Sequence, residues 1–480
     1  MPETAKWNIG LVNHASRYLT VETFGFKLNA DGTSLRKKQM WVLEQESDEG
    51  IYFKCHLGRY LTADPKGNLC CEATEREPNA KFTIVAQDGK WALKSAHNAY
   101  FGATGDQLKC VAKIGKAELW TVHLAMHPQI NLKSVLRKRY AHLDEGSQDI
   151  KVSEIIPWGA DAMVTLEFTD GKYAIVASNN KYLSAGGDLK NELSDDCKFS
   201  LEFHQTNLAF RDHQGKYLTA VGTGRLQTKK ETVTKDELFV IEDSHPQCSF
   251  IGCNDRRVSI KQSTDVKVNQ ADISDTELFQ VIFKKGSNKV SFLSSNEKYW
   301  VVEKGVVKAT ASEVTESGEF ELEWHDTQVA FKTSSGKYLI SKGNAPLSDA
   351  SDEVNASGLF IMELINRPLL VLRGDYGFVG CKGTSNRLEC NRANYDVFHM
   401  EANRGFYTIS SSKGKYWRTE DDGSISVSGD QAGADKFQIE LRGRNGLCIK
   451  SPNGCYLKGE QNGTFNAKGS EVGKYTLWEY

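Results

Sequence analysis

Short runs in which apolar and polar residues alternate recur along the whole chain, and many begin with an aromatic residue and end at a glutamate. Examples are FSLE from Phe199, FELE from Phe320 and FQIE from Phe437. Alternation with a period of two, in runs rich in aromatic and β-branched residues, is typical of β-strands with one buried face. The chain is therefore predicted to consist of many short strands.

A second motif, Gly-Lys-Tyr-Leu or a close variant, lies between successive strand signals. It occurs as GKYL at Gly215 and Gly336 and as GKYW at Gly414. In the segment 329–341 it separates two alternating runs, which predicts a hairpin whose glycine adopts the positive φ that the turn needs. A phosphate-binding loop is not expected, because such a loop continues with Ser or Thr and then a helix.

The aromatic residue of this motif marks a repeat of about 40 residues. The twelve markers are Tyr18, Tyr60, Tyr100, Tyr140, Tyr182, Tyr217, Arg257, Tyr299, Tyr338, Phe378, Tyr416 and Tyr456, with Arg257 replacing the aromatic residue. Units of this length with four short strands are found in β-propeller blades and in β-trefoil lobes. Twelve blades exceed the range of about four to eight that propellers use, so trefoils are favoured.

A longer repeat of about 120 residues groups these units in threes. His127-Pro128, His245-Pro246 and Arg367-Pro368 recur at that spacing, each just after a strand that ends a unit. We therefore predict an all-β protein of four tandem β-trefoil domains, each with three four-stranded units, because closure into a barrel removes free strand edges. The predicted domains are residues 1–126, 127–244, 245–366 and 367–480.

Composition and charge narrow the function without identifying it. The 480 residues include 60 Lys and Arg against 62 Asp and Glu, so no overall field attracts nucleic acid or a membrane surface. The sequence contains no apolar run of membrane-spanning length, and its first residues, MPETAKWNIG, do not resemble a signal peptide. We expect a cytoplasmic protein without membrane insertion, whose eleven cysteines are reduced.

Catalytic and cofactor motifs are not found in the sequence. It contains no HExxH, no GxSxG and no Cys/His cluster with metal-ligand spacing, so neither an enzyme nor a metal or other cofactor is expected. The glutamates at the strand ends recur once per unit, which favours hydrogen bonding at the barrel rim over catalysis. A trefoil lectin is the alternative, although its Gln-x-Trp motif occurs once, at Gln39-Met40-Trp41.

Three basic clusters are candidates for contact with an acidic partner. They comprise Arg36, Lys37 and Lys38 after Ser34; Lys133, Arg137, Lys138 and Arg139; and Lys229, Lys230 and Lys235. From the residues alone, a solvated surface is the simpler interpretation of each.

Several longer segments resemble the fascin family of actin-bundling proteins, which are built from four β-trefoils. The segments are LVNHASRYLTVETFGFKLNADGTSLRKKQMW from Leu11, LAMHPQINLKSVLRKRYAHL from Leu124, KDELFVIE from Lys235, ELINRPLLVLRGDYGFVGC from Glu363 and LWEY from Leu477. The resemblance implies F-actin as the partner of a monomer that packs filaments into tight parallel bundles through at least two separate surfaces. It also implies a place in the actin cytoskeleton and in cell projections such as filopodia. A trefoil lectin or scaffold without actin binding remains the alternative.

The resemblance further implies which residues contact actin. Fascin-like proteins have one surface where the first and last trefoils meet, and the matching residues here are Ser34, Arg36, Lys37, Lys38, Arg367, Arg373, Asp375, Tyr376, Lys458 and Glu460. Lys332 and Lys337 are candidates for a surface on the third domain. Asp375-Tyr376 and Glu460-Gln461 depart from the Glu-His and Asp-His of the vertebrate pattern.

Ser34 matches a regulatory phosphoserine of that family. The basic residues just after it suit a basophilic kinase, and a phosphate there would neutralise the neighbouring cations. From the residues alone, an ordinary exposed turn serine is the simpler interpretation.

Overall fold

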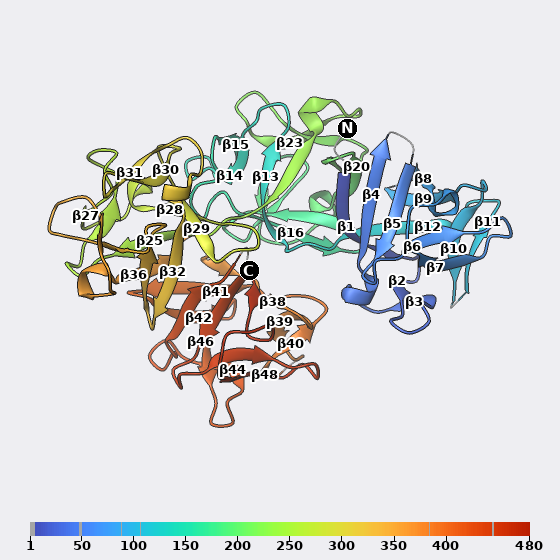
Figure 1. Cartoon of the computed structure of the whole chain (residues 1–480). Helices are drawn as coiled ribbons and strands as arrows, with labels where there is room; N and C mark the ends of the chain where they lie inside the picture. Colours follow the sequence, from blue (N-terminus) through green and yellow to red (C-terminus); the bar gives the residue numbers. More distant parts are fainter. Residues whose placement is uncertain (1–4, 48–49, 88, 106, 384, 444–445) are drawn as a thin grey trace. The chain divides into compact units, whose positions relative to one another are not determined.

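The computed structural model describes residues 5–47, 50–87, 89–105, 107–383, 385–443 and 446–480 (Figure 1). Within them the chain forms 49 β-strands and eight three-residue 3-10 helices, without an α-helix. None of the described helices is long and apolar enough to cross a membrane. The strands form four sheets that follow one another along the chain, so the predicted all-β class is confirmed.

The first sheet is a closed six-stranded barrel with three added hairpins. Its strands are β1 (Ala5–Val12), β2 (Tyr18–Val21), β3 (Leu28–Gly32), β4 (Trp41–Ser47), β5 (Gly50–Cys55), β6 (Tyr60–Ala63), β7 (Leu69–Ala73), β8 (Phe82–Gln87), β9 (Lys90–Ser95), β10 (Tyr100–Thr104), β11 (Gln107–Val111) and β12 (Leu119–Leu124). Strands β1, β4, β5, β8, β9 and β12 pair in that order, and β12 closes the ring on β1 with Ile9 opposite Leu124. The hairpins β2–β3, β6–β7 and β10–β11 contact one another through β3, β7 and β11. A closed barrel with three such hairpins is a β-trefoil.

The second and third sheets repeat this plan. The second contains β13 (Gln129–Ser134), β14 (Tyr140–Leu143), β15 (Ile150–Glu154), β16 (Val164–Thr169), β17 (Lys172–Val176), β18 (Tyr182–Leu183), β19 (Leu189–Lys190), β20 (Ser200–His204), β21 (Asn207–Arg211), β22 (Tyr217–Ala220), β23 (Leu226–Lys230) and β24 (Phe239–Asp243). The third contains β25 (Gln247–Ile251), β26 (Arg257–Ser259), β27 (Lys267–Gln270), β28 (Phe279–Phe283), β29 (Lys289–Ser294), β30 (Tyr299–Glu303), β31 (Val306–Ala311), β32 (Phe320–His325), β33 (Gln328–Lys332), β34 (Tyr338–Ile340), β35 (Ser348–Ser351) and β36 (Phe360–Leu364). The third ring closes where β36 pairs with β25.

The fourth sheet differs in one strand position, which is divided between two short strands. Its members are β37 (Leu369–Leu370), β38 (Arg373–Gly374), β39 (Gly377–Cys381), β40 (Leu388–Arg392), β41 (Phe398–Asn403), β42 (Phe406–Ser411), β43 (Tyr416–Thr419), β44 (Ile425–Gly429), β45 (Phe437–Leu441), β46 (Gly446–Lys450), β47 (Tyr456–Gly459), β48 (Phe465–Gly469) and β49 (Trp478–Glu479). Strand β37 pairs with β41, whereas β38 pairs with β49 near the end of the chain. Together they complete the barrel, so the prediction of four trefoils is confirmed.

The 3-10 helices precede barrel strands. They are η1 (Lys37–Gln39), η2 (Pro78–Ala80), η3 (Lys116–Glu118), η4 (Asp195–Cys197), η5 (Lys235–Glu237), η6 (Asp275–Glu277), η7 (Glu316–Gly318) and η8 (Ala356–Gly358). In η5 and η6 the glutamate at the third position accepts a hydrogen bond from the backbone N–H of the residue before the helix, at 2.9 and 2.8 Å. This reciprocal cap fixes the turn that leads into the next strand.

The chain divides into two compact units. Met1–Ser153 and Val164–Glu242 form one, and Glu154–Met163 and Asp243–Tyr480 form the other. The segment Glu154–Met163 joins the second unit because Gln247 holds it: Gln247 Nε2 donates to Pro157 O at 2.7 Å, and Gly159 N donates to Gln247 Oε1 at 2.7 Å. The residues at which the four domains begin therefore stay predictions.

The repeated motif serves the hairpins, as predicted. Each marker is the first residue of the first hairpin strand, except that β39 begins one residue before Phe378. Gly215, Gly336 and Gly414 have φ of +87°, +86° and +72°, which glycine adopts without strain. The motif is therefore turn chemistry, and the phosphate-loop interpretation is not needed.

The glutamates at the strand ends bond to the marker tyrosines. Tyr217 donates to Glu202 Oε2 at 2.9 Å, and Tyr338 donates to Glu323 Oε2 at 2.8 Å. The same bond is made by Tyr60 to Glu44, Tyr182 to Glu167 and Tyr456 to Glu440. The prediction of a hydrogen-bonding group at the barrel rim is confirmed in these units.

The unit that lost its aromatic marker keeps the interaction in another form. Arg257 Nη1 donates to Glu363 Oε2 at 2.9 Å and to Ser249 Oγ at 2.8 Å, and Glu363 is buried. Replacing Arg257 by leucine is expected to lower the free energy of unfolding by about 1.5–3 kcal/mol, because a hydrogen-bonded charge is left without its partner. Urea denaturation of the variant measures this loss.

Arg257→Tyr is the matched control, since tyrosine occupies this position in most other units. It should recover most of the lost stability. Equal destabilisation by both substitutions would contradict the equivalence of the two rim pairs.

Candidate functional site

The basic residues of the first trefoil surround the short helix η1. Gln39 is buried and donates to Thr20 Oγ1 at 3.0 Å, while its Oε1 accepts from Arg36 N at 3.2 Å. This anchoring leaves Arg36, Lys37 and Lys38 exposed. Lys38 Nζ lies 2.6 Å from Glu22 Oε2 of the neighbouring hairpin. We call Arg36, Lys37 and Lys38 the N-terminal basic patch.

The single Gln-x-Trp motif belongs to the core of this trefoil. Trp41 is fully buried, and its Nε1 donates to Leu19 O at 3.2 Å. Because Gln39 also points inward, the feature that suggested a sugar site is explained by packing.

Ser34 is enclosed rather than displayed. Its side chain is 9% exposed, and its hydroxyl accepts a hydrogen bond from Arg36 Nε at 3.1 Å. The neighbouring Leu35 covers Gly10, where an added Cβ would lie 2.6 Å from Leu35 Cδ1. Ser34 is therefore a largely buried residue and not the exposed turn serine of the simpler interpretation.

Five of the residues predicted in the fourth trefoil come together around Trp478. Its ring is buried, and a Cβ added at Gly374 or Gly459 would lie 2.6 or 2.9 Å from it. Both positions therefore need glycine. Because both glycines contact the Trp478 ring, the residues that flank them in the sequence lie close to this ring. The predicted residues brought together in this way are Arg373, Asp375, Tyr376, Lys458 and Glu460. The sequence separates the two groups by some eighty positions.

Charged and aromatic side chains lie at the surface near Trp478. Lys474 Nζ lies 2.8 Å from Asp375 Oδ2, and this hydrogen bond raises the pKa of Lys474. The rings of Tyr376 and Tyr475 stack at 5.7 Å with planes 7° apart. We call Asp375, Tyr376, Lys458, Glu460, Lys474 and Tyr475 the C-terminal patch.

Sequence reasoning missed Lys474 and Tyr475. They lie between the last hairpin and β49, in a further Gly-Lys-Tyr at Gly473 that falls outside the 40-residue spacing. Tyr475 is 43% exposed, and only the folded chain reveals that it stacks on Tyr376. The available signal was this extra Gly-Lys-Tyr, which the 40-residue repeat does not account for.

Arg373 is less available than the sequence suggests. Its Nε and Nη2 lie 2.7 and 2.6 Å from Glu479 Oε2, and its guanidinium lies 5.9 Å from the ring centre of Phe378. Reversing this charge would place two carboxylates together in a half-buried position. Reversal of the charge at Arg373 is therefore expected to destabilise the fold, whereas Lys458, 3.9 Å from Glu460 Oε1, is more exposed.

Arg367 lies in the interior, and its prediction as an actin contact is wrong. The side chain is 1% exposed. It donates to Asn366 O and Ser244 O, both at 3.0 Å, and its guanidinium lies 5.2 Å from the ring centre of Tyr480. Burial lowers the pKa of Arg367. This arginine holds the start of the fourth trefoil instead of meeting a partner.

The two lysines predicted in the third trefoil differ in their surroundings. Lys332 lies in β33, opposite Glu321, with its Nζ 5.6 Å from the ring centre of Tyr338. Lys337 is exposed in the turn between β33 and β34. Lys337 is therefore the one whose charge can be changed with least effect on packing.

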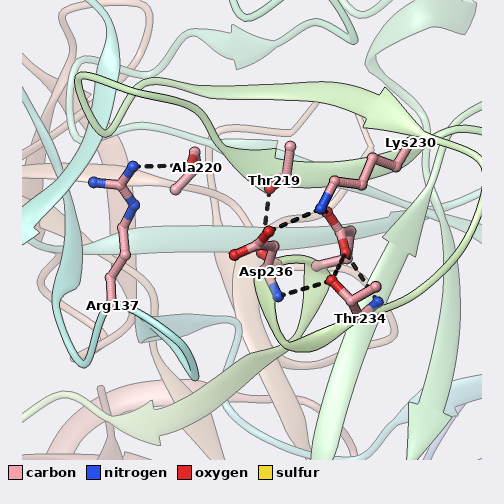
Figure 2. Close-up of polar contacts among 7 residues, drawn as sticks. Arg137, Thr219, Ala220, Lys230, Thr234 and Asp236 are labelled. Carbon is pink, nitrogen blue, oxygen red and sulfur yellow. Dashed lines mark hydrogen bonds and ion pairs between the residues drawn. The ribbon is translucent and has the colours of Figure 1, made fainter.

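Each of the two basic clusters of the second trefoil contains a residue that bonds within the protein: Arg137 in one and Lys230 in the other (Figure 2). Arg137 Nη2 donates to the carbonyl of Ala220 at 3.1 Å and also to that of Val221 at 2.9 Å. Lys230 Nζ lies 2.8 Å from Asp236 Oδ2, beside the Thr234 cap of η5. These cations stabilise loops, which supports the simpler interpretation for them.

No group of three or more His, Cys, Asp or Glu side chains is placed to hold a metal ion among the residues that the structure describes. The arrangement instead offers exposed charges and aromatic rings on separate trefoils, which suits contact with another macromolecule.

Comparison with known proteins identifies relatives along the full chain. A family model described as the fascin domain matches four times, at residues 15–122, 130–241, 253–362 and 375–480. Fascin-2 of Bos taurus is 42% identical over 487 residues, which cover 100% of this chain and 99% of that protein. Fascin of Strongylocentrotus purpuratus is 38% identical over 499 residues, with 99% of each chain covered. Fascin-3 of Homo sapiens is 26% identical over 493 residues, covering 100% of this chain and 98% of the relative.

Proposed function

The chain belongs to the fascin family, and from that membership we propose that it binds actin filaments and cross-links them into tight parallel bundles. The observation that carries the proposal is the fourfold fascin-domain match, which spans every trefoil. Fascin-family proteins are structural rather than catalytic, so the proposal requires contact surfaces and no reaction.

We propose that the contacts are made through at least two surfaces on one monomer. The resemblance assigns the N-terminal basic patch and residues of the C-terminal patch to one of them, and Lys332 and Lys337 are candidates for another. Actin filaments present acidic surface, so exposed lysines speed encounter and pair with carboxylates. Such binding weakens as salt screens the charges.

A protein of this kind works in the cytoplasm, within the actin cytoskeleton and in projections such as filopodia. A rigid trefoil fixes the positions of its surface groups, because each barrel is closed and its hairpins contact one another. Stiff cross-links give ordered bundles, whereas flexible linkers would permit loose networks.

Sedimentation with purified actin filaments tests the proposal. A bundling protein brings actin into the pellet at low centrifugal force, whereas a protein that only binds filaments appears in the pellet at high force. We expect the low-force pellet to contain most of the actin. A chain that remains in the supernatant at both forces would be a lectin or scaffold without actin binding, and the proposal would fail.

Phosphorylation of Ser34 is proposed as a regulator of the first surface. A phosphate adds about −1.5 to −2 charges beside Arg36, Lys37 and Lys38, and so opposes their attraction to acidic groups. Because the Ser34 hydroxyl accepts a hydrogen bond from Arg36 Nε, its modification also displaces Arg36 from its present position.

Ser34→Asp is expected to weaken filament binding at low salt, less strongly than phosphorylation, and the difference should shrink as salt is raised. Ser34→Ala should bind as the wild type does, because it changes no charge. Co-sedimentation of Ser34→Ala, Ser34→Asp and the phosphorylated protein with actin across a salt series measures these differences in binding. Equal binding by all of them at low salt would show that Ser34 is not a switch.

A further inference from the structure

The tip of the hairpin β2–β3 displays a bare aromatic side chain. Phe24 is 91% exposed, whereas the next most exposed large apolar residue in the described part of the chain is Leu136 at 53%. Single exposed apolar residues are common on proteins. A phenylalanine with almost its whole surface in water is far less so and calls for a physical reason.

The backbone of this tip is held in a costly conformation. Gly25 has φ of +70° and Phe26 has φ of +48°. The left-handed region is disfavoured for a bulky residue such as Phe26, and strain of this kind gathers at functional sites. Phe26 packs against the core, with the Arg59 guanidinium 5.3 Å from its ring centre. The turn therefore directs one phenylalanine inward and leaves the other outside.

A backbone hydrogen bond fixes the conformation of this tip in the free protein. Glu22 N donates to Lys27 O at 2.9 Å across its base. A preorganised loop loses little conformational entropy on binding. This favours a fixed pocket on another protein over the fluid interior of a lipid bilayer as the place for the ring.

Exposed lysines lie near the base of the hairpin that carries Phe24. Lys38 Nζ pairs with Glu22 Oε2 at 2.6 Å, which brings the N-terminal basic patch beside the hairpin and neutralises its carboxylate. Lys37 and Lys38 are both exposed. Lys27 is exposed next to the tip.

We propose that Phe24 is the apolar anchor of the first filament-binding surface. Its ring inserts into an apolar hollow of the actin filament while Lys27, Lys37 and Lys38 pair with carboxylates around that hollow. This inference rests on the proposed function and adds to it the residue whose burial supplies affinity, since a few buried anchor residues carry most of the binding energy in many interfaces.

Phe24→Ser tests the anchor without disturbing the fold. The protein concentration at which half of the actin pellets at low force should rise by at least about tenfold, as for loss of an interface hot spot. Because Phe24→Ser removes an apolar contact, this rise in protein concentration should be similar at low and high salt. The effect of Lys37→Glu should instead shrink as salt is raised. The melting temperature should not change, and Phe24→Trp should retain bundling.

Ile273→Ser is the matched control, since Ile273 is also an exposed apolar residue, on the third trefoil. It should leave bundling unchanged. If the wild type bundles actin and Phe24→Ser does so equally well, the anchor is disproved while the proposed function stands; if the wild type fails to bundle, both fall. Unaltered bundling together with loss of binding to vesicles of phosphatidylcholine and phosphatidylserine, or with loss of self-association, would assign Phe24 to another partner and overturn the inference.

Discussion

Replacing Trp478 by alanine is expected to lower the free energy of unfolding of the second compact unit by about 3–5 kcal/mol. The indole is 1% exposed, and its Nε1 donates to Leu457 O at 3.0 Å. It meets the ring of Phe465 edge-on at 5.0 Å and fills the space between Gly374 and Gly459. Its removal leaves a large cavity beneath the C-terminal patch.

Urea denaturation followed by circular dichroism measures this loss. Trp478→Phe is the control, because it keeps most of the volume and loses the hydrogen bond, and it should cost less than alanine does. A change below about 1 kcal/mol for alanine would be the size of an ordinary substitution and would mean that the ring does not organise this region.

Reversing the charge at Lys337 is expected to separate bundling from filament binding. In Lys337→Glu the low-force pellet should contain little actin, while the protein should still appear with actin at high force through its other surface. The exposed position of Lys337 in its turn predicts that folding is unaffected, because exposed charges contribute little to stability.

Lys285→Glu provides the comparison for this effect. It is an exposed lysine of the same trefoil and makes the same change in net charge, yet it lies in another loop. It should bundle as the wild type does. Equal loss of bundling in both variants would indicate a general charge effect rather than a surface at Lys337.

The fold could be predicted because its signals are local and repeated. The marker residues lie at fixed places in each hairpin, so their spacing gives the length of one unit. The spacing of the junction prolines shows that three units form one domain. One unit has Arg257 in place of the marker tyrosine. Its position was still predicted from the spacing, and Arg257 pairs with Glu363 as the tyrosines of other units pair with their glutamates.

The candidate site could be predicted only in part, because its geometry depends on residues distant in sequence. Arg373 meets Glu479 across 106 positions, which no local pattern reveals. The resemblance placed Arg367 among the actin contacts, yet backbone carbonyls and Tyr480 accommodate its side chain in the interior. The exposure of Phe24 depends on the left-handed turn at Gly25 and Phe26, and alternation of residue types does not report it.

The central claim is that a single chain carries two separate filament-binding surfaces, and a mixing experiment tests it most directly. One variant, Lys337→Glu, lacks the third-trefoil surface, and a second, Lys37→Glu with Lys458→Glu, lacks the other. If one monomer must supply both surfaces, an equal mixture of the two variants will bind filaments yet leave actin out of the low-force pellet, in which the wild type collects it. Recovery of wild-type bundling by the mixture would show that two chains combine to supply the surfaces, and would contradict the account.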